Sequence, residues 1–170
     1  MDKEIELLHE TELFKDLHAE QITEVLSIAR EVSFSEGEII VREGDIGDTM
    51  YIILEGSVDV VKSLVMDGMD EDETTGKNKV FTRLSAKDHA VFGEIALLEE
   101  FRRTATIKAV TDCVLYEIRK DDFLKLAEWD YALGYRILLN LSRIVSARLR
   151  KADEDTIKLT TVLSFILKEI

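Results

Sequence analysis

The amino-acid sequence predicts a mainly β domain that is flanked by α-helices. Three observations favour this fold class: a helical pattern opens the chain, short strand-like runs fill its middle, and helical stripes close it. The middle section, residues 32–118, is rich in β-branched residues, and glycines stand between many of its apolar runs. Short strands at such close spacing are typical of an antiparallel sandwich or barrel.

Residues 3–32 are predicted to be helical. Apolar residues recur in this segment mostly at spacings of three and four, which places them on one face of a helix. They comprise Ile5, Leu7 and Leu8, followed by Ile22, Val25, Leu26, Ile28 and Ala29.

The strands are predicted from short apolar runs in the middle of the chain. These runs are residues 39–41, 51–54, 58–61, 80–82, 105–107 and 114–116. Tight turns with positive φ are expected at the intervening glycines, which adopt that conformation at little cost. These glycines are Gly37, Gly44, Gly47 and Gly56. The polar and acidic residues 66–79 separate two strands and are interpreted as a solvated hairpin loop.

The last third of the chain returns to a helical pattern. Asp121 or Asp122 is suited to cap a short helix that ends near Ala127. A long helix follows, with an apolar stripe, and a separate amphipathic helix is expected to begin near residues 153–155. The stripes are Leu133, Ile137, Leu141, Ile144 and Val145, then Leu159, Val162, Leu163, Ile166, Leu167 and Ile170. We therefore divide the chain into a domain of residues 1–152 and a C-terminal amphipathic helix of residues 153–170.

Composition restricts the function classes. The chain has 170 residues, of which 46% are hydrophobic, enough for one domain with a core. The single cysteine, Cys113, excludes an intrachain disulfide and favours a cytoplasmic location; we interpret it as a small buried residue. The sequence contains no run of about 20 apolar residues, so we expect no membrane partner. The net charge of −13 argues against a direct nucleic-acid partner.

Residues 92–107 give the clearest indication of a binding site. Gly93 permits a tight turn, and residues 94–98 suit a short helix, whose free N–H groups favour an anion. Arg103 follows at the start of the next strand, where its guanidinium can grip phosphate oxygens, and Thr104 adds a hydroxyl donor. Glu94 is an acceptor, so it suits a sugar hydroxyl rather than the phosphate.

This segment resembles the phosphate-binding cassette of the cyclic nucleotide-binding domain family, to which the bacterial catabolite activator protein and the regulatory subunits of protein kinase A belong. The family pattern is F-G-E, then aliphatic-small-aliphatic, then Arg and a small or hydroxyl residue. Residues 43–60 resemble the family's paired-glycine turn, and residues 109–123 its last barrel strand and the entry to its B helix. Three motifs in the correct order make the resemblance specific.

The resemblance implies an eight-stranded antiparallel jelly-roll barrel that binds cyclic AMP, or with less support cyclic GMP, without catalysis and without a metal. Cyclic AMP is favoured because the overall match is to bacterial-type domains. Glu94 is then expected to accept from the ribose 2′-hydroxyl, Arg103 to pair with the phosphodiester, and the N–H groups of Ala96 and Leu97 to point at the phosphate. The expected ligand-binding residues are Phe92, Gly93, Glu94, Ile95, Ala96, Leu97, Arg103, Thr104 and Ala105. A residue among 140–149 is expected to cover the base.

The sequence departs from the family pattern just before the cassette. Lys87 and Asp88 stand where the family usually has Gly-Asp, and two more residues than usual separate Leu84 from Phe92. We therefore expect a bulge in the strand that approaches the cassette. His89 lies here without other barrel histidines, which disfavours a metal-dependent barrel enzyme.

Two other functions remain open at the level of sequence. The chain could be a ligand-free dimerisation or scaffold domain, or a fragment of a transcription regulator that lacks its DNA-binding domain. The C-terminal helices could join two copies or hold another protein. Basic residues from Arg136 to Lys151 are interpreted as favourable charge near a helix C-terminus.

Overall fold

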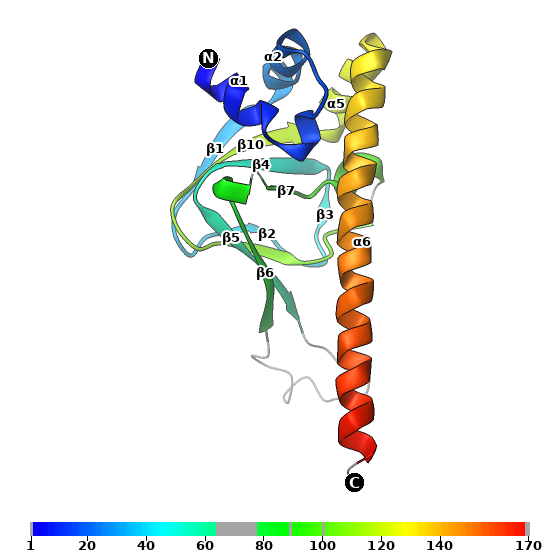
Figure 1. Cartoon of the computed structure of the whole chain (residues 1–170). Helices are drawn as coiled ribbons and strands as arrows, with labels where there is room; N and C mark the ends of the chain where they lie inside the picture. The colour runs from blue at the N-terminus through cyan, green and yellow to red at the C-terminus, as the bar shows by residue number, and fades with distance from the viewer. Residues whose placement is uncertain (1, 64–77, 89, 100, 169–170) are drawn as a thin grey trace.

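The computed structural model describes residues 2–63, 78–88, 90–99 and 101–168 (Figure 1). The helical segments are α1 (Asp2–His9), η1 (Glu12–Phe14), α2 (Ala19–Ile28), η2 (Ala86–Asp88), α4 (Ile95–Leu98), α5 (Lys120–Trp129) and α6 (Tyr131–Lys168). The strands are β1 (Arg30–Phe34), β2 (Ile39–Val41), β3 (Ile46–Gly47), β4 (Thr49–Glu55), β5 (Ser57–Ser63), β6 (Asn78–Ser85), β7 (Val91–Phe92), β8 (Phe101–Arg102), β9 (Thr106–Ala109) and β10 (Cys113–Arg119).

Two antiparallel sheets form the body of the domain. One has the strand order β1-β10-β4-β7 and the other β2-β9-β5-β6, while β3 and β8 form a separate pair. The predicted fold class, mainly β with flanking helices, is confirmed, and the two larger sheets supply the eight strands of the jelly roll. Among the described residues no strand pairing joins the two sheets, so the barrel is not strictly closed.

The apolar residues divide between two cores. One lies between the sheets and includes Ile53, Val58 and Leu115. The other joins the helices to the outer side of the β4 sheet, and includes Phe14, Phe123 and residues of α6 such as Leu141. Burial of apolar surface is the main source of stability, and it attaches the N-terminal helices to the first part of α6.

The predicted helical segment of residues 3–32 is interrupted. α2 ends at Ile28 and β1 begins at Arg30, because residues 30–34 pair with β10. Tertiary strand pairing outweighs the local helical pattern here. Most of the predicted hairpin loop of residues 66–79 lies outside the described residues.

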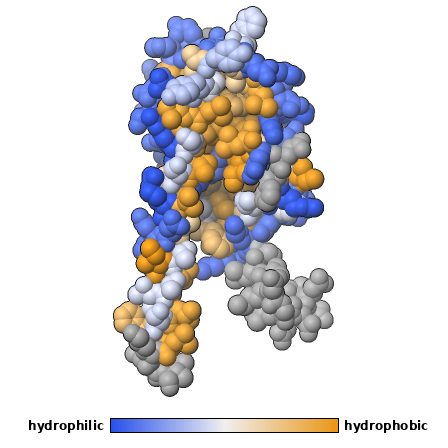
Figure 2. All heavy atoms as spheres, turned by 90° about the vertical axis from the view of Figure 1, so that its right-hand side faces the viewer, coloured by the Kyte–Doolittle hydropathy of each residue, from blue (hydrophilic) through white to orange (hydrophobic). Residues whose placement is uncertain are grey.

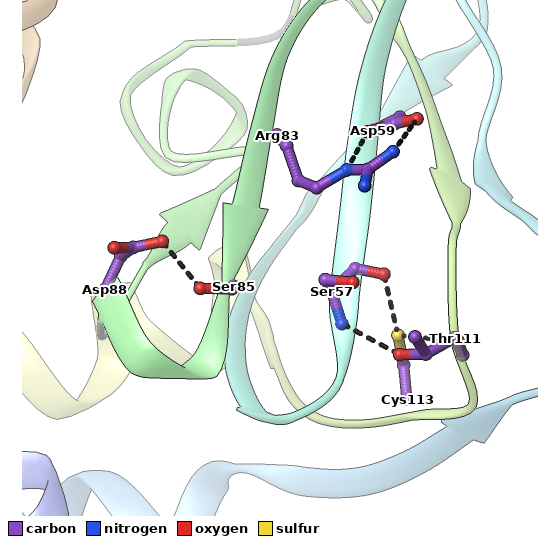
Figure 3. Close-up of polar contacts among 7 residues, drawn as sticks. All are labelled: Ser57, Asp59, Arg83, Ser85, Asp88, Thr111 and Cys113. Atoms are coloured by element: carbon purple, nitrogen blue, oxygen red, sulfur yellow. Dashed lines mark hydrogen bonds and ion pairs between the residues drawn. The ribbon is translucent and has the colours of Figure 1, made fainter.

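A polar cluster fixes the strands that lead to the cassette (Figure 3). Arg83 on β6 donates to both carboxylate oxygens of Asp59 on β5, at 2.7 and 3.0 Å, and Ser85 donates to Asp88 at 2.6 Å. The additional residues before Phe92 form the short helix η2. The pairing of β5 with β6 shifts register between Val60 and Val61, so the strand that leads to η2 does contain the expected irregularity.

Cys113 lies at the other end of the same close-up. Its thiol is 2% exposed and donates to the carbonyl of Ser57 at 3.3 Å (Figure 3). The interpretation of Cys113 as a small buried residue is therefore confirmed.

Helix α6 is continuous from Tyr131 to Lys168, and it runs along the barrel and beyond it (Figure 1). The predicted start of a separate helix near residues 153–155 is wrong, because acidic residues there fit a helix interior and Asp155 pairs with Lys158 one turn later. The basic residues before them are consequently not near a helix C-terminus. Arg136 instead lies 3.6 Å from the carboxylate of Asp16. In the described part of the chain, no helix is long and apolar enough to cross a membrane.

Candidate cyclic-nucleotide site

The cassette turn has the geometry that its sequence predicts. Gly93 has φ +75°, and the one-turn helix α4 starts directly after Glu94. The N–H groups of Ala96 and Leu97, however, donate to the carbonyls of Gly93 and Glu94 at 3.0 and 3.2 Å. Both N–H groups are thus engaged within the turn of α4, and their contact with a phosphate stays a prediction.

Arg103 lies in the connection between β8 and β9. Its N–H donates to the carbonyl of Asp45 at 2.7 Å, and its carbonyl accepts from Gly44 at 2.9 Å. Its guanidinium donates to the carbonyl and the hydroxyl of Thr49, at 2.8 and 2.7 Å. Backbone and side chain are thus both held by the first strands of the barrel, and the guanidinium retains further N–H groups for an anion.

Two glycines make room for the Arg103 side chain. A Cβ on Gly47 would overlap Nε of Arg103, and one on Gly93 would lie 2.8 Å from its Nη1. Gly47 lies in β3 and does not have positive φ, so its predicted role as a turn glycine is wrong. The other three predicted turn glycines, Gly37, Gly44 and Gly56, do have positive φ.

Polar groups of differing exposure surround the guanidinium, from the buried Tyr51 to the exposed Asp45 and Asp48. Desolvation lowers the pKa of Arg103 from its ordinary value, while Tyr51 and the nearby carboxylates of Asp48, Asp45 and Glu117 oppose that shift. The hydroxyl of Tyr51 donates to Glu117 at 3.0 Å and accepts from Thr49 at 3.2 Å, and its ring stacks on Phe92. Desolvation of the hydroxyl raises the pKa of Tyr51. The cation is therefore held by a network that begins deep in the barrel.

Glu94 is paired with α6. Its carboxylate is almost fully buried and accepts from Nη1 of Arg148 at 2.5 Å, while Nη2 of Arg148 donates to the carbonyl of Val91. A buried carboxylate requires a partner of this kind. Arg148 thus connects the cassette directly to the C-terminal helix, 54 residues away in the sequence.

Arg103 and Glu94 line one cavity of about 550 Å³, a size common among small-molecule sites. Eight of the nine predicted site residues line it: Phe92, Gly93, Glu94, Ile95, Ala96, Arg103, Thr104 and Ala105. The ninth, Leu97, is 2% exposed and packs in the helix-side core instead. Most of the predicted cassette residues therefore line the same cavity.

The cavity walls differ in character. Apolar side chains of the sheet line one part, including Val60, Leu84 and Ile107. The charged residues of the lining comprise four cations, Arg102, Arg103, Arg148 and Lys151, and two anions, Glu94 and Asp155. The lining is thus locally cationic in a chain of net charge −13, which suits an anion with an apolar part.

The wall contributed by α6 lies further along the chain than predicted. Asn140, at the start of the predicted range, is buried and donates to the carbonyls of Leu13 and Lys15. Of residues 140–149 only Arg148 lines the cavity, and the other α6 residues there are Lys151, Ala152, Asp155, Thr156 and Leu159. These residues were not predicted, because the acidic residues 153–155 suggested a helix start at this point; the apolar pattern that continues through Leu159 was the available signal.

The family model "Cyclic nucleotide-binding domain" matches residues 31–130. The chain belongs to this family. Human potassium/sodium hyperpolarization-activated cyclic nucleotide-gated channel 4 is 36% identical to this cyclic nucleotide-binding domain over 116 residues, which are 68% of the chain and 8% of the channel. The chain spans between 8% and 13% of the length of such channels.

Solved structures show the same fold. The catabolite activator protein of Thermus thermophilus matches 88% of this cyclic nucleotide-binding domain and 63% of its own chain, with a TM-score of 0.72 at 27% identity. The regulatory domain of Toxoplasma gondii PKA with cAMP matches 74% of this chain and 43% of its own, with a TM-score of 0.60 at 26% identity. These relatives are regulatory proteins and channels, not enzymes by name.

Proposed function

We propose that the chain is a regulatory module that binds cyclic AMP reversibly, and cyclic GMP more weakly, without catalysing a reaction. The observation that carries this proposal is the convergence of Arg103 and Glu94 in one cavity. Their chemistry is complementary to a cyclic nucleotide, which has a single anionic phosphodiester beside one free ribose hydroxyl. The regulatory domain of Toxoplasma gondii PKA, whose structure contains cAMP, supports the choice of adenine.

The proposed contacts follow from the positions of the charged groups. The phosphodiester pairs with the N–H groups of Arg103 that Thr49 leaves available, and the ribose 2′-hydroxyl donates to Glu94. The base then extends toward the apolar wall that contains Val60 and Leu84. Thr104, also in the lining, supplies a hydroxyl to the phosphate or to the edge of the base.

Arg148 connects the proposed ligand site to α6 through its hydrogen bond to Glu94. The ribose hydroxyl and Arg148 share the same acceptor, the carboxylate of Glu94. A ligand that weakens the Glu94–Arg148 pair favours a different position of α6, and it shifts the two conformations only by the difference in its affinity for them. The proposed output is therefore a rearrangement of the C-terminal helix, which we expect to act on a second copy of the chain or on another protein.

We propose a cytoplasmic location from the single cysteine, as expected from sequence, and no direct partner among nucleic acids or membranes. A ligand-free scaffold domain is the second candidate, supported by the exposed apolar residues of α6.

Calorimetric titration of the chain with cyclic AMP, and separately with cyclic GMP, tests the proposal. Saturable one-site binding with tighter affinity for cyclic AMP is expected. Absence of heat with both nucleotides, on protein shown to be folded and nucleotide-free, would contradict it and favour the scaffold domain. Tighter binding of cyclic GMP would contradict only the choice of base.

A further inference from the structure

A second cavity lies on the outer face of the sheet that contains β2, β9 and β5. Its volume is about 570 Å³, a size that also fits a small molecule. Successive residues of a strand point to opposite faces of a sheet, and β9 follows this rule. Ala105 and Ile107 line the nucleotide cavity, whereas Thr106 and Lys108 line the second cavity. The two cavities therefore lie on opposite faces of the same sheet, and we refer to the second one as the outer cavity.

The outer cavity differs in character from the exposed apolar surface of the molecule. That surface is prominent on the distal part of α6, where the helix extends beyond the barrel and carries side chains such as Leu163 (Figure 2). The outer cavity instead combines two apolar side chains, Ile39 and Val61, with two cations, Arg42 and Lys108. Apolar walls with a few charged groups are typical of a site for a small charged ligand.

The two cations of the outer cavity are available to a ligand. Within the described part of the chain, neither Arg42 nor Lys108 forms an ion pair or a side-chain hydrogen bond. Asp59 is opposite Lys108 in the pairing of β5 with β9, but both its carboxylate oxygens accept from Arg83 (Figure 3). Glu43 also lines the cavity, so two cations and one carboxylate face it. In a chain of net charge −13, this local excess of positive charge favours an anion.

Thr106 adds a hydroxyl to the outer cavity. Its Oγ1 accepts from the N–H of Glu43 at 3.0 Å, which leaves the hydroxyl proton available for donation. The cavity thus offers a guanidinium, an ammonium and a hydroxyl as donors. A phosphate monoester matches this set better than a carboxylate does, because it carries close to two negative charges and three acceptor oxygens.

We propose that the outer cavity binds the phosphate group of a small phosphate monoester that has an apolar substituent. The planar guanidinium of Arg42 holds two phosphate oxygens, and the ammonium of Lys108 holds the third as a point charge. The substituent packs against Ile39 and Val61, of which Ile39 is 37% exposed. Free phosphate shares the anionic part of this chemistry and lacks the apolar part. The site does not depend on whether the nucleotide cavity is occupied.

NMR titration of the isotope-labelled chain with phenyl phosphate, at constant ionic strength, tests the site. Saturable shifts of the amides of residues 39–43 and 106–108 are expected for wild type. They are also expected for Arg103→Ala, in which a phosphate can no longer pair with the cation of the nucleotide cavity. Affinity should be at least about tenfold weaker in the double variant Arg42→Gln, Lys108→Gln, because the charge-assisted hydrogen bonds of both cations are lost.

The matched control is the double variant Lys87→Gln, Arg150→Gln. It also removes two positive charges, at exposed residues outside the lining of the outer cavity, and is expected to bind as wild type does. Equal weakening in the two double variants would overturn the proposal, because the probe would then respond only to overall charge. Binding that is lost in Arg103→Ala and kept in Arg42→Gln, Lys108→Gln would also overturn it, since the phosphate would lie in the nucleotide cavity.

Inorganic phosphate as a second probe distinguishes free phosphate from a phosphate monoester. It should shift the same amides with affinity about fivefold weaker or more, because it buries no apolar surface against Ile39 and Val61. Equal affinity for the two probes would overturn the assignment of a monoester. Absence of shifts with both probes would overturn the site itself, whatever the result of the cyclic nucleotide titration.

Discussion

The two sides of the candidate cavity are built in different ways. On the cassette side, Arg103 is fixed by Thr49 and by backbone bonds to residues 44–45, and Gly47 and Gly93 leave the space it occupies. On the helix side, residues 151–159 are exposed, and Arg148 is the α6 residue that bonds to the cassette.

This difference separates binding from signalling. A preorganised cation holds an anion without much conformational cost, whereas a helix held by few contacts can move when one of them changes. We therefore expect substitutions on the cassette side to change ligand affinity strongly. Substitutions on the helix side should chiefly change stability and the response of α6.

The difference between the cassette side and the helix side is tested most severely at Gly47. In Gly47→Ala the new Cβ overlaps the Arg103 side chain, while the backbone of Gly47 is already compatible with alanine. The guanidinium should be displaced with the fold intact, and affinity for cyclic AMP should fall about tenfold or more, since charge-assisted hydrogen bonds contribute about 1.5–3 kcal/mol each. Calorimetry measures the affinity and circular dichroism the fold. Ile46→Ala, at the exposed neighbouring residue, is the control and should bind as wild type.

The helix side is tested at Arg148. In Arg148→Ala the carboxylate of Glu94 remains buried without its cation, so the free energy of unfolding should fall by about 1–2 kcal/mol, a value reduced for the partial exposure of Arg148. Urea denaturation measures it, and Arg150→Ala on the exposed surface of the same helix is the matched control. Equal stability of the two variants would show that the Glu94–Arg148 pair does not hold α6 to the cassette.

The smallest expected effect is a pH dependence at Tyr51. Desolvation raises the pKa of this hydroxyl in the folded chain, so the folded state keeps its proton to higher pH than the unfolded state does. The contribution of the Tyr51 hydroxyl to the free energy of unfolding is therefore complete below the ordinary tyrosine pKa of about 10. It is lost as pH rises through the higher pKa of the folded state. Wild type should lose stability above about pH 10 more steeply than Tyr51→Phe does. Tyr135→Phe, at an exposed tyrosine, should follow wild type.

The cassette could be predicted from sequence because its parts are close together in the chain. Gly93, Glu94 and Arg103 lie within eleven residues, and their spacing alone predicts a turn, a short helix and a returning cation. The use of the Ala96 and Leu97 N–H groups inside α4 could not be foreseen, because it depends on the local backbone conformation.

The other features depend on contacts between distant segments. Arg148 reaches Glu94 only because α6 continues past residues 153–155 along the barrel, and the acidic residues there suggested a new helix start instead. The role of Gly47 likewise appears only when Arg103, from a distant segment, passes beside it. The apolar pattern of α6 continues past residues 153–155 in the sequence, but the acidic residues there favoured a helix start.

The most direct test of the account is a parallel calorimetric titration of wild type, Arg103→Ala and Arg119→Ala with cyclic AMP. Arg119 is exposed and pairs with Asp48 outside the cavity lining, so its removal controls for the loss of one positive charge. We predict saturable binding by wild type and Arg119→Ala, and affinity at least about tenfold weaker for folded Arg103→Ala. Equal affinity of all three proteins would contradict the assignment of Arg103 as the residue that binds the phosphodiester.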